Sequence, residues 1–280
     1  MPKVLSEEQV EHYRRDGYVA PVRLLDAAAA ARCRRDFEAV EASMGGALRG
    51  AVRNKFYLRF PWAYRLATHK GLLDAVEDLI GPDIMIYHNM SWVKERGDET
   101  YVSWHQDNTY FGHDPCEVVT AWIALSPATL ESGCVQVLPG THLLGQLPLT
   151  APDTSEANLL SSGMRVDFDT DSVAPVPLVL QPGEMSLHHA FLIHGSPPNI
   201  AADRRLGITF IFHSPALGQL GAGRTSALLV RGEDRYGHFD PEQPPVAADD
   251  SDTIARHEHA VAIYRDKIKE LGNTTLKRFD

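Results

Sequence analysis

The sequence predicts a β-sandwich whose core is packed against helices from both ends of the chain. Between about residues 82 and 232, short segments rich in β-branched and aromatic residues alternate with turn signals such as Pro139-Gly140 and Ser214-Pro215. Helices do not separate these segments, which favours an antiparallel sandwich or barrel over a parallel sheet. The fold class is therefore mainly β with flanking helices, and we interpret residues 1–280 as a single domain.

Local signals place the individual elements. Ser6 and Gln9 have the form of a capping box, which predicts a helix that ends near Gly17 and leads into a short strand over 18–20. Asp26 can cap a second helix, over 26–43. Further helices are expected over 64–80, ending at Gly81-Pro82, and over 252–272. The expected core strands cover 84–94, 118–125, 134–138, 176–180, 185–194, 206–213 and 227–230.

Composition narrows the class of partner. The net charge of −10 argues against nucleic acid or an anionic membrane as the main partner and leaves a small-molecule substrate. Cys33, Cys116 and Cys134 form no CxxC pair, so we expect free thiols in a reducing compartment, not disulfides or a zinc cluster. The N-terminus has no apolar signal core and no apolar run approaches a membrane span, so a cytoplasmic protein is expected.

The segment WHQD carries the first sign of chemistry. Residues i and i+2 of a strand point to the same face, so His105 and Asp107 can aim an imidazole and a carboxylate into the sandwich. A third ligand must come from elsewhere, and His188, His189 and His194 are the candidates. Two histidines and one carboxylate leave three positions open on non-haem Fe(II), enough for a bidentate oxoacid and O2.

An arginine at a suitable distance selects among these histidines. A guanidinium can grip a carboxylate of the oxoacid through two hydrogen bonds. Arg205 lies 11 residues beyond His194, whereas the same step from either other histidine reaches an asparagine or an isoleucine. Arg204 and Arg205 should point to opposite faces of a strand, and the spacing favours Arg205. His194 is therefore the predicted distal ligand.

Three segments resemble the phytanoyl-CoA dioxygenase family of Fe(II)/2-oxoglutarate-dependent oxygenases: WHQD, TAWIALSPATLESGCVQVLPGTH and HGSPPNIAADRR. The resemblance extends from about residue 6 to residue 215. It implies a double-stranded β-helix, the jelly roll of cupin-like proteins, with His105, Asp107 and His194 binding Fe(II). It also implies that Arg205 and Ser196 bind the distal carboxylate of 2-oxoglutarate, that Trp122 lines the cosubstrate pocket, and that O2 is the second cosubstrate.

A basic stretch precedes the metal motif. Basic and apolar residues alternate over 53–59, which predicts a strand with one basic face. In the resembled family a lysine near this place assists cosubstrate binding, which makes Lys55 the candidate. Arg53 or Arg59 is then a candidate for contact with an anionic group of the substrate. The alternative is a solvated edge strand whose charges discourage aggregation.

The substrate itself has no clear signature. Gln106 and Asn108 follow the metal motif closely and are candidates for contact with the substrate. An acidic chain offers little basic surface for the phosphates of a CoA thioester, so we expect a small polar metabolite or a natural-product intermediate. Related halogenases have a small residue in place of the carboxylate ligand, so Asp107 favours hydroxylation over halogenation.

Other functions stay open at this point. The same chemistry can desaturate, cyclise or epoxidise. A cupin-like metalloprotein with non-redox chemistry would have no need of Arg205. A catalytically silent binding protein would have no reason to keep the complete set of His105, Asp107, His194 and Arg205.

Overall fold

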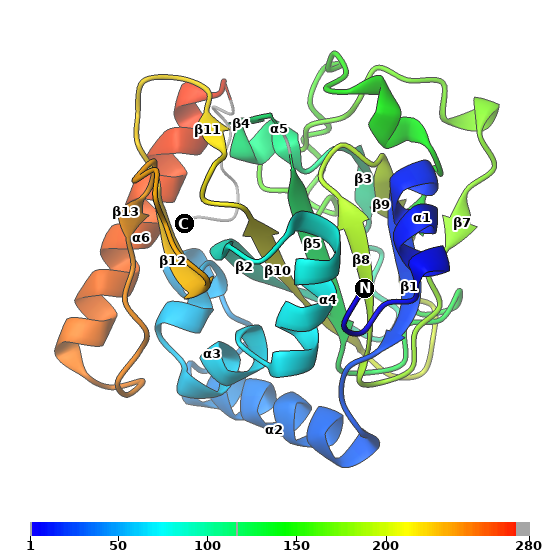
Figure 1. The fold of residues 1–280 in the computed structure, drawn as a ribbon. Helices are drawn as coiled ribbons and strands as arrows, with labels where there is room; N and C mark the ends of the chain where they lie inside the picture. The colour runs from blue at the N-terminus through cyan, green and yellow to red at the C-terminus, as the bar shows by residue number, and fades with distance from the viewer. Residues whose placement is uncertain (1, 116, 273–280) are drawn as a thin grey trace.

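The computed structural model describes residues 2–115 and 117–272 and confirms the sandwich of facing sheets (Figure 1). The larger sheet has seven strands in the order β1-β8-β5-β10-β2-β12-β13, and the smaller has four in the order β3-β9-β6-β7. The strands of the larger sheet are β1 (Tyr18–Arg23), β2 (Ile84–Lys94), β5 (Val118–Ala124), β8 (Glu184–His189), β10 (Arg205–His213), β12 (Ser226–Arg231) and β13 (Asp240–Pro241). Those of the smaller are β3 (Val102–His105), β6 (Gln136–Val137), β7 (Val176–Pro177) and β9 (His194–Ser196). A separate pair joins β4 (His113–Asp114) to β11 (Gly218–Gln219).

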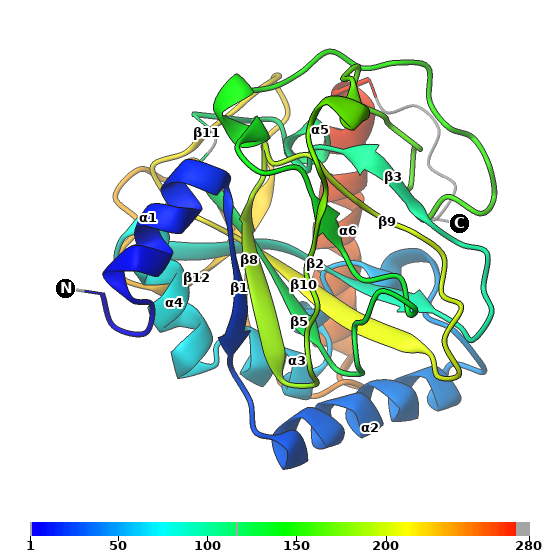
Figure 2. The same cartoon turned by 90° about the vertical axis from the view of Figure 1, so that its right-hand side faces the viewer.

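Helices from both ends of the chain surround the sheets, as predicted. They are α1 (Glu7–Asp16), α2 (Ala27–Ser43), α3 (Pro61–Ala67), α4 (Lys70–Ile80) and α6 (Ser251–Glu270). A short helix that was not predicted, α5 (Asn108–Phe111), lies between β3 and β4. The capping box of Ser6 and Gln9 is present, and Gly17 ends α1 in the left-handed conformation at φ 85°. In Figure 1 α1 and α6 lie on opposite sides of the molecule, and Figure 2 shows α2 crossing beneath the sheet.

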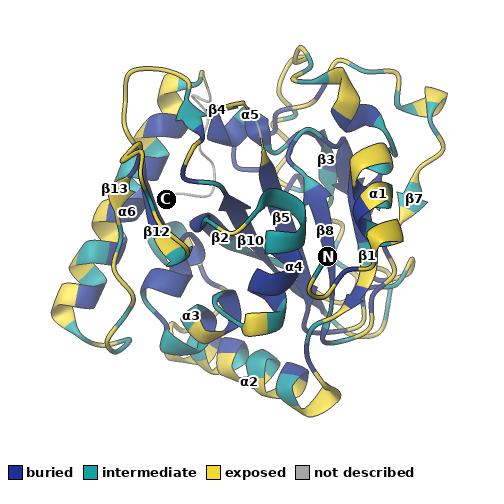
Figure 3. Cartoon of the chain, in the orientation of Figure 1, coloured by how far each residue is buried: buried dark blue, intermediate teal, exposed yellow. Residues whose placement is uncertain are grey.

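The two faces of the larger sheet have different neighbours. Alternate residues of its central strands join side chains of α2, α3 and α4 in one apolar core. On β10 these are Leu206, Ile208, Phe210 and Phe212, and Figure 3 shows how deeply the central strands are buried. The opposite face of the sheet is turned toward the smaller sheet and lines the cavity described below.

Several predicted elements are wrong in detail. The helix expected over 64–80 is two helices, because the chain breaks at Thr68 and the His69 side chain accepts from Gly71 N to cap α4. The strand expected over 185–194 is divided between β8 and β9, which belong to different sheets. The strand expected over 53–59 is wrong: the chain forms two short 3₁₀ helices, Gly50–Arg53 and Phe56–Leu58. Between them Lys55 takes a positive φ of 46°, which a strand cannot accommodate.

Two further sequence-based expectations concern thiols and membranes. Cys33 and Cys134 are free thiols, while Cys116 lies outside the described residues. Among residues 2–115 and 117–272 no helix combines the length and apolar character needed to cross a bilayer.

Candidate metal centre

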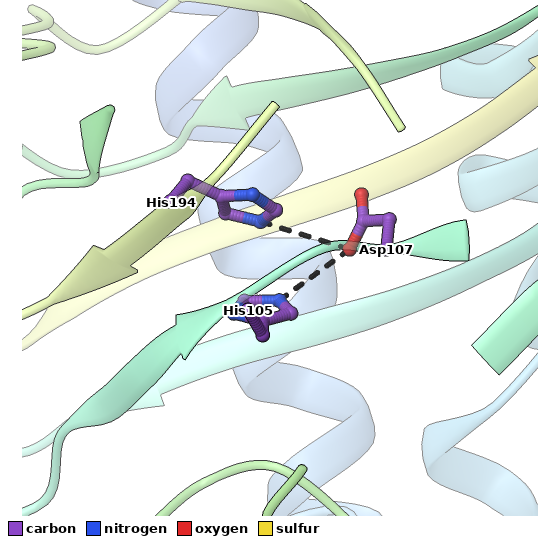
Figure 4. A group of neighbouring side chains, drawn as sticks. All are labelled: His105, Asp107 and His194. Carbon is purple, nitrogen blue, oxygen red and sulfur yellow. Dashed lines mark ion pairs between the residues drawn. The ribbon is translucent and has the colours of Figure 1, made fainter. Parts of the chain in front are cut away.

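His105, Asp107 and His194 meet between the two sheets (Figure 4). His105 ends β3 and His194 begins β9, and the register pairs the two residues directly. Asp107 lies just beyond β3, at φ −61° and ψ −37°, where the chain turns into α5. The expected strand geometry therefore does not extend to Asp107, yet the turn still directs its carboxylate toward both imidazoles.

The spacing of the three side chains suits a shared cation. Asp107 Oδ1 lies 3.5 Å from His105 Nε2 and 3.6 Å from His194 Nε2, and one donor atom from each residue falls within 4.8 Å of the others. Donor atoms that bind one ion at about 2.1 Å are roughly 3.0–3.5 Å apart. These separations are too long for good hydrogen bonds and close to those of a ligand set.

The same local device orients both histidines. His105 Nδ1 lies 2.9 Å from Ser103 O, and His194 Nδ1 lies 2.9 Å from Leu192 O. A carbonyl oxygen only accepts, so each Nδ1 carries the proton and each Nε2 keeps its lone pair for a metal. In both cases the acceptor lies two residues upstream in the chain.

The other oxygen of Asp107 is also held in place. Thr120 Oγ1 donates to Asp107 Oδ2 at 2.6 Å, and His188 Nε2 lies 3.5 Å from the same oxygen. Burial raises the pKa of Asp107, but the imidazoles of His194, His105 and His188 outweigh burial and hold the pKa well below its usual range. Burial also disfavours the charged form of His194 and therefore lowers its pKa. One carboxylate and two imidazoles are a suitable ligand set for a divalent ion.

Arg205 begins β10 and projects into the same cavity. It is 1% exposed, and its guanidinium lies 5.4 Å from the centre of the Trp122 ring and donates to Gly133 O at 2.6 Å. Burial lowers its pKa to about 10, so it remains charged at neutral pH. No carboxylate of the described residues forms an ion pair with it. A buried cation without a counterion is costly, which marks this end of the cavity as an anion site.

Ser196 lies beside this anion site, together with Lys94, which was not predicted from the sequence to belong to it. Lys94 Nζ donates to Ser196 Oγ at 2.6 Å and also to the carbonyl of Pro197. Burial, reinforced by the charge of Arg205, lowers the pKa of Lys94 to about 6. Lys94 pairs with Arg205 in the register of β2 and β10, a relation that the sequence alone does not show.

The structure does not bring Lys55 to this cavity. Its ammonium is completely buried and donates to Glu242 at 2.5 Å and to Ser226 O at 2.9 Å. Arg53 lines a separate cavity, with its guanidinium 5.6 Å from the centre of the Trp92 ring.

Gln106 and Asn108 are likewise absent from the cavity lining. The amide nitrogen of Gln106 donates to the carbonyls of Gly145 and Phe191, and its oxygen accepts from Leu147 N. The side-chain amide of Asn108 donates to His113 O and accepts from His113 N. Both side chains use their hydrogen-bonding groups to hold the loops behind the metal motif.

The triad lies in the wall of a cavity between the two sheets. His105, Asp107, His194, Arg205, Ser196 and Trp122 all line it. Several other lining residues were not predicted to belong to the site, among them His88, Trp92, Thr120 and Tyr264. The strands and the helix that carry these residues were largely predicted. Their approach to the triad, however, depends on the strand register and on the packing of α6, which the sequence does not show.

Comparison with known proteins identifies the family. The sequence profile described as "Phytanoyl-CoA dioxygenase (PhyH)" matches residues 13–207, which include the whole triad and Arg205. The chain belongs to the phytanoyl-CoA dioxygenase family. The resemblance seen in the three sequence segments is thereby confirmed, and the family is one of Fe(II)/2-oxoglutarate-dependent oxygenases.

Among curated members of the phytanoyl-CoA dioxygenase family, the human peroxisomal phytanoyl-CoA dioxygenase is 34% identical over 156 residues. That alignment covers 54% of this chain and 46% of the human protein, so the match spans less than half of its relative.

Two solved structures confirm the jelly-roll fold. The apo form of a non-heme monooxygenase, ThoJ, has a TM-score of 0.83 and 32% identity, covering 94% of this chain and 98% of its own. A structure of CytC3 with Fe(II) and alpha-ketoglutarate has a TM-score of 0.63 over 89% of this chain and all of the other. At 20% identity the CytC3 likeness shows the fold alone.

Proposed function

We propose that this protein is an Fe(II)- and 2-oxoglutarate-dependent dioxygenase that hydroxylates an aliphatic C–H bond of a small molecule. The observation that carries the proposal is Arg205, a buried guanidinium without a carboxylate partner among the described residues, in the cavity that holds the triad. A metal site alone suits several divalent ions and many reactions. A metal site that shares its cavity with an unpaired cation suits a dianionic oxoacid.

The residues divide the work by position. His105, Asp107 and His194 would hold the iron, and bound iron with 2-oxoglutarate and O2 supplies an oxidant strong enough for an unactivated C–H bond. Arg205 binds the distal carboxylate of the oxoacid, assisted by Ser196. Trp122 packs against the guanidinium and keeps this end of the cavity dry. Lys94 holds the Ser196 hydroxyl in place.

The position of Asp107 favours hydroxylation over halogenation. Its Oδ1 faces both histidines while its Oδ2 is bonded by Thr120, so the carboxylate can fill one metal position and leave three for the oxoacid and O2. Non-redox chemistry at the same metal would leave Arg205 without a role.

The test is the conversion of 2-oxoglutarate to succinate by the Fe(II)-loaded protein under air. Even without substrate, slow turnover with ascorbate as the reductant should consume 2-oxoglutarate and O2 and release CO2 and succinate in equal amounts. Asp107→Ala should abolish succinate release, and Arg205→Ala should raise the KM for 2-oxoglutarate by roughly a hundredfold or more, the effect of removing a charged hydrogen-bonding partner.

Arg204 provides a matched control one residue away. Its guanidinium bonds Glu41 and Glu95 on the outside of the sheet and does not line the cavity. Arg204→Ala should therefore leave the KM for 2-oxoglutarate unchanged. Equal effects of Arg204→Ala and Arg205→Ala, or no succinate from folded wild-type protein, would refute the proposal.

A further inference from the structure

The inner face of the larger sheet has two chemically distinct ends. The register aligns four residues in one row across β8, β5, β10 and β2: His188, Thr120, Ile211 and His88. Thr120 bonds Asp107, so this row lies at the level of the triad. Arg205 begins β10 six residues before Ile211, and its guanidinium lies over the ring of Trp122, which pairs with Thr209, two residues before Ile211. The oxoacid that Arg205 would bind therefore occupies one end of the cavity, and the end at His88 is left for another molecule.

His88 is the unusual residue of that second end. It is 2% exposed, lines the cavity, and stacks on Tyr264 of α6 with ring centroids 4.0 Å apart and planes at 27°. Neither ring nitrogen has a hydrogen-bond partner among the described residues. Native structures pair nearly all buried polar groups. Two other buried histidines in the described part of the chain, His113 and His188, also lack partners on both nitrogens, but His113 lies outside the cavity lining and His188 faces Asp107. The position of His88 in the wall indicates that the missing partner belongs to a ligand.

The charges around His88 keep it neutral. Burial lowers its pKa well below the usual value, Lys55 and Arg53 lower it further, and Asp107 opposes them. A neutral imidazole offers one N–H donor and one acceptor. It can therefore bond a hydroxyl, carbonyl or amide group of a ligand without any change of charge.

The remaining walls offer little to a charged molecule. Aromatic and aliphatic side chains predominate in the cavity lining, notably Tyr264, which stacks on His88, and Phe111, Leu160, Ile211 and Met90. Apart from histidines, the charged residues of the lining are Asp107 and Arg205, which the metal and the oxoacid would neutralise. The nearby cations Lys55 and Arg53 stand outside the lining, and both disfavour a further positive charge.

We infer that the substrate is an uncharged, largely apolar molecule that presents one hydrogen-bonding group to His88. The inference rests on the proposed function, since it assumes that the oxoacid occupies the Arg205 end. This class differs from the small polar metabolite expected from the sequence and is compatible with the natural-product intermediate expected as its alternative. The inference also makes His88 the residue that selects the orientation of the substrate over the triad.

Four ligands of one shape test the inference. Naphthalene, 2-naphthol, 2-naphthoate and 2-naphthylmethylammonium should be titrated into protein loaded with Fe(II) and 2-oxoglutarate without O2, with binding followed by probe fluorescence. We expect 2-naphthol to bind about tenfold more tightly than naphthalene, the value of one hydrogen bond to a buried group. Both charged probes should bind at least about tenfold more weakly than 2-naphthol, because each would lose its hydration without gaining a partner.

Substitution of His88 isolates its part. His88→Phe keeps a ring to stack on Tyr264, so naphthalene should bind as before while 2-naphthol loses its advantage. The control is His113→Phe, which replaces another buried histidine that packs on Tyr87 outside the cavity lining and should keep the preference for 2-naphthol. His88→Gln, which restores a donor and an acceptor, should recover part of the preference.

Three results would overturn the inference: equal binding of 2-naphthol and naphthalene, tighter binding of either charged probe, or no saturable binding of 2-naphthol. The proposed function is judged separately by succinate release. A protein that forms succinate but shows no preference for 2-naphthol refutes the substrate class alone.

Discussion

Strand β10 is buried along its whole length, yet its two faces have opposite chemistry. One face packs on the helices through Leu206, Ile208, Phe210 and Phe212, and the other lines the cavity through Arg205, Thr209 and Ile211. The first face stabilises the fold by burying apolar surface. The second includes a cation and a hydroxyl at the depth of the core, which add little stability and cost desolvation. Burial alone therefore does not distinguish residues of the core from residues of the site. The alternation of apolar and polar side chains along the strand does.

The largest expected effect tests the helix-facing side of β10. Phe210→Ala should lower the free energy of unfolding by about 3–5 kcal/mol, the usual cost of deleting a buried phenyl ring. The neighbouring Thr209→Val, which removes a hydroxyl that accepts from Trp92 Nε1, should cost only about 1 kcal/mol. Denaturant unfolding measures both. Similar losses from the two substitutions would show that the faces do not differ as described.

The next effect concerns the cavity side. Asp107→Ala should weaken Fe(II) binding by more than about a hundredfold, because removal of even a residue that only orients a metal ligand weakens metal sites by ~10–100-fold. Its free energy of unfolding should change by no more than about 1 kcal/mol, since a buried carboxylate is costly to desolvate. Anaerobic equilibrium dialysis and denaturant unfolding give the two numbers. A variant that unfolds easily but binds Fe(II) normally would reverse the assignment.

A smaller effect on stability and on 2-oxoglutarate binding is expected at Gly207, where the Trp122 ring leaves no room for a side chain. A Cβ at Gly207 would overlap the Trp122 ring, which packs against Arg205. Gly207→Ala should cost about 1–3 kcal/mol of stability through overpacking and should weaken 2-oxoglutarate binding about tenfold by moving the ring. Ile208→Val on the opposite face should cost about 1 kcal/mol and leave the Kd for 2-oxoglutarate unchanged. Calorimetric titration with 2-oxoglutarate compares them.

The smallest effect is a pH dependence at Lys94. Its pKa is lowered to about 6, and a bound dianion nearby would raise it, so binding takes up a proton. The affinity for 2-oxoglutarate should therefore be highest below about pH 6 and fall as pH rises above it, by less than about tenfold per pH unit. Calorimetric titrations with 2-oxoglutarate in two buffers of different ionisation enthalpy should measure the number of protons taken up on binding. Lys94→Met should show neither uptake nor slope; an unchanged slope would assign the proton to another group.

Much of this division could be predicted from the sequence. The period-two alternation of β10 and the spacing from His194 to Arg205 indicate which arginine faces inward. The HxD motif and the capping box depend on residues close in sequence, so they can be recognised without a structure. The family resemblance added the cosubstrate and the jelly roll.

The misinterpreted regions depend on distant contacts. The stretch 53–59 alternates like a strand, but Lys55 is held in a left-handed turn by an ion pair with Glu242, 187 residues further along the chain. His88 and Lys94 were unremarkable members of a predicted strand. Their roles appear only when the register places His88 opposite Ile211 and Lys94 opposite Arg205.

The most direct test of the central claim is the visible absorption of the anaerobic protein with Fe(II) and 2-oxoglutarate. Chelation of the oxoacid by iron in the triad should produce a metal-to-ligand charge-transfer band. The band should be absent in Asp107→Ala, weakened at the same 2-oxoglutarate concentration in Arg205→Ala, and intact in Arg204→Ala. A well-folded wild-type protein that binds Fe(II) and shows no such band would contradict the account.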